Sequence, residues 1–179
     1  MMNLELESMA IQMPFVEQHP NREGFRGVLT LVDVASDKPP AGARGHRVIL
    51  TRAAAEVALA SLLGMGLDYA PSLDRHDTRR KVGVITRAEI VGKELELSGH
   101  LFARDFPEIV KEIEKSSKRR SDGASPVTTR ALGMSYEIAD ARVADVRSSI
   151  WTLTHVTFTG AAILRRDKAA YHDTWIELE

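Results

Sequence analysis

Three residues of this chain, His76, Ser135 and His155, have the side chains that nucleophilic catalysis requires. A serine hydroxyl is a weak nucleophile until a base removes its proton, and an imidazole can act as that base near neutral pH. The base in turn needs a third group that accepts its other N–H and fixes its tautomer. We expect Ser135 as nucleophile, His76 as base and His155 as the third group, with the neighbouring Asp74 or Asp77 as rivals for that last role.

Each of the three residues also has a purely structural interpretation. Ser135 alternates with apolar residues in a predicted strand, which is typical of an outward-facing polar side chain. His155 shares a predicted strand face with apolar and hydroxyl residues, as a core histidine would. His76 lies in the charged segment 73–77, which is typical of a solvated turn. The order of the three, rather than any one of them, indicates chemistry.

Short strands and two helices are expected to position these residues. Period-two alternation and β-branched runs predict strands over Val28–Val34, Val48–Leu50, Val82–Thr86, Glu94–Phe102, Leu132–Ile138, Arg142–Val146 and Ile150–Thr159. One helix is predicted over residues 52–63 with Thr51 as its N-cap, and a second begins at Asp105. Strands and helices that do not alternate regularly favour a β-rich α+β fold over a doubly wound sheet.

The length of 179 residues suits one domain that spans residues 1–179. Within it we expect an N-terminal extension over residues 1–26 and a mobile loop over the polar residues 116–130. The formal net charge of −1 creates no field that would attract nucleic acid or anionic lipid. The absence of cysteine excludes disulfides, thiolate metal sites and a cysteine nucleophile.

The first residues lack the pattern of a signal peptide, and no apolar run approaches the roughly 20 residues that span a bilayer. The expected compartment is therefore the cytoplasm. The main alternative chemistry is a metal-dependent hydrolase with Asp74, His76 and Asp77 as ligands. Metal sites need three or four converging ligands, and no second cluster accompanies this one, so neither a metal nor another cofactor is expected. No Gly-x-Ser-x-Gly elbow supports a general esterase.

The order of these motifs resembles that of the prohead (capsid maturation) proteases of tailed phages, which are related to the herpesvirus assemblin serine proteases. The resemblance extends over nearly the whole chain. It rests on His76, on the run Gly133–Ile138 (GMSYEI), and on Leu153–Thr159 (LTHVTFT) followed by the small residues Gly160–Ala162. Many phage members carry an acidic residue where this chain has His155, whereas assemblins carry histidine there.

The resemblance implies a β-barrel of mostly antiparallel strands surrounded by helices, and a serine endopeptidase with a Ser135–His76–His155 triad. Arg165 and Arg166 match part of the assemblin stretch that stabilises the oxyanion. The implied substrates are the scaffold and major capsid proteins, and the enzyme itself, inside the immature capsid in the host cytoplasm. The resemblance also implies self-association as a dimer or larger homo-oligomer. A catalytically inactive capsid-assembly protein of the same fold is the alternative.

Overall fold

The computed structural model describes residues 19–118 and 131–179. Part of the expected N-terminal extension lies outside these ranges, and Glu23 already begins the first strand, β1 (Glu23–Leu31). The expected loop 116–130 is also divided. Residues 119–130 lie outside the described residues, whereas Ser116 belongs to helix α2 (Pro107–Lys118), and its hydroxyl accepts hydrogen bonds from the backbone N–H groups of Ala131 and Leu132.

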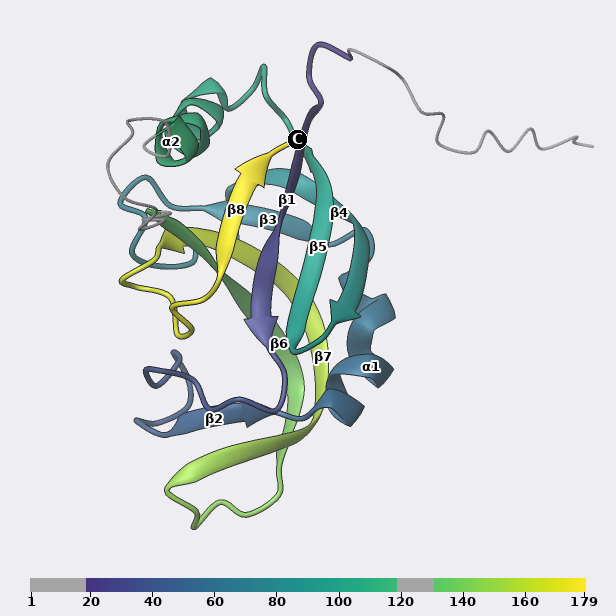
Figure 1. Ribbon diagram of the computed structural model, residues 1–179, viewed down its shortest axis with the longest axis vertical. Coiled ribbons are helices and arrows are strands. Elements are labelled where there is room, and N and C mark those ends of the chain that lie inside the picture. The colour runs from purple at the N-terminus through teal and green to yellow at the C-terminus, as the bar shows by residue number, and fades with distance from the viewer. Residues whose placement is uncertain (1–18, 119–130) are drawn as a thin grey trace, which may run out of the picture.

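Strands make up most of the molecule and form one sheet that curls into a half-barrel (Figure 1). Its further strands are β2 (Arg47–Leu50), β3 (Gly66–Tyr69), β4 (Lys81–Val91), β5 (Glu94–Leu101), β6 (Leu132–Val143), β7 (Ile150–Arg165) and β8 (Trp175–Leu178). The order is β2-β7-β3-β4-β5-β1-β8, and β6 pairs with β7. Only the β2–β7 and β3–β7 pairs are parallel among these strands. The expected β-rich α+β class is confirmed.

Strand β7 is the longest of the described elements and has partners on both edges. Its residue Leu153 pairs with Val143 of β6 and with Leu50 of β2, so β6 and β2 lie on opposite edges. Farther along, β3 occupies the same edge as β2, next to Ala161 and its neighbours. The hairpin of β6 and β7 extends beyond the rest of the sheet at the bottom of Figure 1.

Several predicted boundaries differ from the structure. The two strands expected over 132–138 and 142–146 form the single strand β6, whose pairing with β7 continues through register shifts near Asp140, a residue with φ of 52°. Strand β7 continues past Thr159 to Arg165. The sequence pattern also missed β3 and β8, which are four residues long and too short to show a clear periodicity.

Helix α1 (Arg52–Ala58) begins as predicted, because the Thr51 hydroxyl accepts a hydrogen bond from the backbone N–H of Ala54 at 3.2 Å. A 3₁₀ turn, η1 (Leu59–Leu62), continues it. Helix α2 begins two residues after the expected Asp105. Neither described helix has the length and apolar character that a membrane crossing requires.

The core fills the inside of the curled sheet. Its largest fully buried side chains come from nearly all elements: Phe25, Leu29, Leu50, Leu62, Leu67, Ile85, Leu95, Leu101, Ile109, Ile113, Met134 and Phe158. Glycines allow neighbouring strands of the sheet to approach closely. At Gly99 of β5, an added Cβ would lie 2.0 Å from the carbonyl oxygen of Val84 on β4.

We predict that Gly99→Ala destabilises the protein by about 2 kcal/mol or more, because the methyl group would meet backbone rather than a side chain that can move away. The free energy of unfolding in urea measures this effect. Ser98→Ala, on the same strand, should change that free energy by less than about 0.5 kcal/mol. Equal stability of the two variants would contradict the close approach of β4 and β5.

Candidate functional site

Four neighbouring strands bring a row of residues to one face of the sheet. Ser135 of β6 lies opposite Ala162 of β7, and Asp68 of β3 lies opposite the same alanine. Lys81 of β4 in turn lies opposite Asp68. Residues in register on paired strands share a face. The sheet therefore places Ser135, Ala162, Asp68 and Lys81 side by side although they are far apart in the sequence.

Glu137 shares this face with Ser135 because side chains two residues apart on a strand point the same way. It lies opposite Gly160 of β7. A Cβ at Gly160 would lie 2.6 Å from Oε2 of Glu137 and 3.3 Å from Nζ of Lys81. The missing side chain at Gly160 thus leaves the space in which the Glu137 carboxylate meets Lys81.

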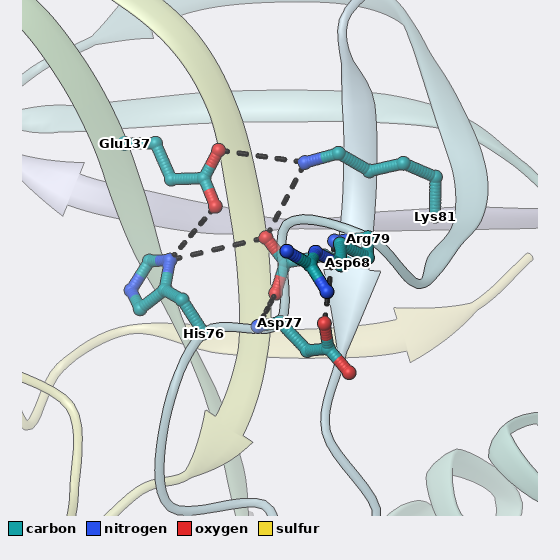
Figure 2. Close-up of polar contacts among 6 residues, drawn as sticks. All are labelled: Asp68, His76, Asp77, Arg79, Lys81 and Glu137. Atoms are coloured by element: carbon teal, nitrogen blue, oxygen red, sulfur yellow. Dashed lines mark hydrogen bonds and ion pairs between the residues drawn. The ribbon is translucent and has the colours of Figure 1, made fainter.

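The loop between β3 and β4 carries His76 to the same place. Two hydrogen bonds fix this loop to the sheet. The backbone N–H of Arg165 donates to the Leu73 carbonyl at 2.7 Å, and the backbone N–H of Asp77 donates to Oδ1 of Asp68 at 2.9 Å. His76 is therefore held between two anchored positions of a short loop, and its ring points toward the carboxylates (Figure 2).

One histidine and one lysine surround the two carboxylates (Figure 2). Nδ1 of His76 lies 3.2 Å from Oε1 of Glu137 and 3.9 Å from Oδ2 of Asp68. Nζ of Lys81 lies 3.4 Å from Oε2 of Glu137 and 3.5 Å from Oδ2 of Asp68. The Asp68 side chain is fully buried and that of Glu137 is 14% exposed. Buried charges persist only when they are paired, as they are here.

The two carboxyl groups differ in proton affinity. Burial, with the adjacent Glu137, raises the pKa of Asp68 to about 7. Burial also raises the pKa of Glu137, but hydrogen bonds with Asp68 and His76 and the charge of Lys81 outweigh burial, so that the pKa of Glu137 is lowered overall. Near neutral pH, Glu137 is therefore the ionised partner that faces His76, and Asp68 carries a proton in part of the molecules.

His76, Ser135 and Glu137 line a common cavity of about 480 Å³. With Nδ1 of His76 directed at Glu137, the opposite ring nitrogen, Nε2, faces away from the carboxylates (Figure 2). A carboxylate on Nδ1 fixes the tautomer in which Nε2 can accept a proton. The structure thus places two of the three predicted residues, His76 and Ser135, on the lining of one cavity, and the carboxylate beside Nδ1 of His76 is that of Glu137.

His155 lies elsewhere. It pairs with Arg142, whereas Ser135 pairs with Ala162, so seven residues of β7 separate His155 from the position opposite the serine. At about 3.3 Å per residue, this corresponds to about 23 Å. The structure therefore does not bring His155 to the other two predicted residues. The expected Ser–His–His triad is therefore not assembled, and the side chain that contacts Nδ1 of His76 is Glu137.

Arg165 and Arg166, which the resemblance implies as oxyanion-stabilising residues, form ion pairs elsewhere. The Arg165 guanidinium contacts the Asp167 carboxylate at 3.2 Å, and the Arg166 guanidinium contacts the Asp173 carboxylate at 3.5 Å. Neither arginine is among the described residues that line the cavity with Ser135. The role of Arg165 at the site is instead structural, since its backbone N–H anchors the His76 loop.

The ligand set expected for a metal site does not converge. Asp74 accepts a hydrogen bond from the Ser72 hydroxyl, and the Asp77 carboxylate accepts one from the Arg79 backbone N–H at 3.2 Å. Among the described residues, the three that could instead hold a metal ion are Asp68, His76 and Glu137, whose ligand atoms lie within 4.8 Å of one another. Lys81 already places a positive charge between the carboxylates of Asp68 and Glu137.

Sequence reasoning missed Asp68, Lys81 and the role of Glu137. The period-two pattern around Ser135 places Glu137 on the face of the serine, and this was the available signal. Asp68 lies in the four-residue strand β3, which was not predicted, and only the pairing of β3 with β7 brings it near β6. Lys81 gave no signal of its own because a single lysine at the start of a strand is typical of a solvated side chain.

We predict that Asp68→Asn flattens the pH dependence of stability. A pKa raised to about 7 means that the folded protein binds more protons than the unfolded chain between about pH 4 and 7. Asp68 therefore makes stability fall as pH rises through this window, by at most about 1.4 kcal/mol per pH unit. Urea unfolding at pH 4.5, 5.5, 6.5 and 7.5 measures the slope. Asp74→Asn, at an exposed carboxyl, should leave the slope in this window unchanged; an unchanged slope in Asp68→Asn would contradict the raised pKa.

We predict that Gly160→Ala lowers the free energy of unfolding by about 1–3 kcal/mol, because the new methyl group displaces the Glu137 carboxylate from Lys81. Urea unfolding measures the loss. The exposed neighbour Thr159→Ala serves as control and should cost less than about 0.5 kcal/mol. If Gly160→Ala were as stable as the control, Glu137 would not occupy the space above β7.

No protein-family model and no curated protein matches this sequence. The interpretation of the site therefore depends on its own geometry: a serine, a histidine and a carboxylate around one cavity, with a lysine and a second carboxyl behind them.

Proposed function

We propose that this chain is a serine hydrolase with Ser135 as nucleophile, His76 as general base and Glu137 as the group that orients the base. The observation that carries the proposal is the contact of 3.2 Å between Nδ1 of His76 and Oε1 of Glu137, in a cavity that Ser135 also lines. In the proposed reaction, Nε2 of His76 accepts the Ser135 proton as Oγ attacks a carbonyl carbon. The resulting imidazolium then donates that proton to the leaving group.

Lys81 and Asp68 support this arrangement without contacting the substrate. Lys81 holds Oε2 of Glu137 at 3.4 Å, which leaves Oε1 for the histidine. The raised pKa of Asp68 limits the negative charge beside Glu137 near neutral pH. Glu137 therefore remains a single, paired carboxylate, which stabilises the imidazolium that forms during catalysis more than a neutral histidine would.

We further propose that the hydrolase is an endopeptidase of the prohead-protease type with an assemblin-like fold. The support is the order of the motifs around His76 and Ser135 and the small residues after Thr159, together with the curled, β-rich sheet. In this proposal the substrates are scaffold and coat-protein segments, the enzyme cleaves itself as well, and it works as a homo-oligomer inside an immature capsid. A glutamate in the third role agrees with the acid-bearing phage pattern.

The proposal is tested with a fluorophosphonate probe, which reacts covalently with activated serines. We expect labelling of the full chain at Ser135, located by mass spectrometry, and no labelling of Ser135→Ala. His76→Ala and Glu137→Gln should slow labelling by about 10²-fold or more, because each removes part of the activation of the hydroxyl. His155→Ala and Ser148→Ala are the controls and should label within about twofold of the unaltered protein.

Three outcomes would overturn the proposal. Labelling that persists in Ser135→Ala would exclude this nucleophile. Loss of labelling with a chelator would favour metal-dependent chemistry at Asp68, His76 and Glu137. No labelling, together with no cleavage of scaffold or coat protein at any pH between 5 and 9, would favour an inactive capsid-assembly protein.

A further inference from the structure

The cavity beside Ser135 extends along strand β6 as an open groove. Its lining follows this strand from Ser135 to Val143, on the order of 25 Å of extended chain. The loop 40–43 and residues of β2 and β7 form its other walls. A groove of this shape accommodates an extended polypeptide better than a compact small molecule.

Apolar side chains dominate the groove beyond the serine. They come from the loop after β1 and from strands β2, β6 and β7, and they include Ala43, Val48, Ile138, Val143, Trp151 and Leu153. Glu137 is the single carboxylate among the described lining residues, and these include no lysine or arginine. Such a lining stabilises apolar side chains and gives no partner to acidic ones.

Trp151 forms a fixed wall of this groove. Its ring stacks on the His46 ring with centroids 4.5 Å apart and planes 12° apart. Its Nε1–H donates to the Val146 carbonyl at 3.2 Å. An aromatic ring held on one face and at its polar atom is ordered before a ligand arrives, which lowers the entropy lost on binding.

The free edge of β6 supplies a second binding element. Among the strands that the structure describes, β6 forms backbone pairs with β7 alone. The N–H groups of Leu132 and Met134 on its other edge already donate to the hydroxyls of Ser116 and Thr174. Beyond Met134, the backbone N–H and C=O groups on that edge can pair with an extended segment, as in the addition of a β-strand to a sheet. Backbone pairing favours a polypeptide over a small ester or a lipid as the occupant.

We infer that the groove binds an extended segment of a protein substrate that carries large apolar side chains, such as Leu or Phe, on one side of the bond that Ser135 attacks. This inference rests on the proposed function, because the serine defines where the bond lies. It adds a substrate preference, and it names Trp151, Leu153, Val143 and Ile138 as the residues that determine it.

The test measures binding to Ser135→Ala, which cannot cleave, by fluorescence polarisation of two labelled peptides. One is fluorescein-Ala-Ala-Leu-Ala-Phe-Ala-Ala-amide, and in the other Ser replaces Leu and Phe. We expect the apolar peptide to bind at least tenfold more tightly. Adding Ala141→Glu, at an exposed lining position, should weaken its binding at least tenfold. Ala139→Glu, an exposed position on the same strand outside the lining, should change it less than twofold.

Equal binding of the two peptides, or equal effects of the two glutamate variants, would overturn the inference. Hydrolysis of short apolar esters by a protein that binds neither peptide would also overturn it, in favour of a small acyl substrate. These results are separate from the probe experiment. If the protein binds the apolar peptide more tightly but Ser135 is not labelled, the proposed chemistry is wrong and the inference about the groove holds. If Ser135 is labelled but the two peptides bind equally, only the inference about the groove is wrong.

Discussion

The pairing of β7 on both of its edges is the constraint on which the rest of the structure depends. One edge bonds to β6 over most of its length, and the other bonds first to β2 and then to β3. Because β7 stands between β3 and β6, Asp68 and Ser135 face each other across a single residue, Ala162. Gly160 has no side chain and Ala162 has only a methyl group. The face of β7 at these positions therefore leaves room for the carboxylates, the lysine and the histidine to meet.

The charged groups at this position determine one another's protonation. Two carboxyl groups that share a buried site cannot both ionise freely, and the pKa of Asp68 rises while that of Glu137 falls. Lys81 contacts both, and His76 completes the group from the loop above. The arrangement therefore keeps one ionised carboxylate, that of Glu137, beside the imidazole of His76 near neutral pH.

The fold class, the Thr51 cap and the selection of His76 and Ser135, which line one cavity, could be predicted from sequence, because each depends on local patterns: alternation, a capping residue, or the order of short motifs. That the Glu137 carboxylate rather than His155 contacts His76 could not be. Glu137 lies two residues from Ser135 on the same strand, but only the register of β6 against β7 places His155 seven residues along β7 from the position opposite the serine. Register is set by bulges and by short strands such as β3, and these leave almost no trace in a single sequence.

The positions of Ser135 and Glu137 on one strand have a further consequence. The spacing between the Ser135 hydroxyl and the Glu137 carboxylate is set by the strand itself, so thermal motion of the sheet moves the two residues as a unit. His76 comes from a loop that is tied down at Leu73 and Asp77 by main-chain groups. The imidazole is thus the adjustable part of an otherwise rigid site. In both hydrogen bonds the loop contributes backbone groups, the Leu73 carbonyl and the Asp77 N–H. The exposed side chains between these two positions can therefore change during evolution without displacing His76.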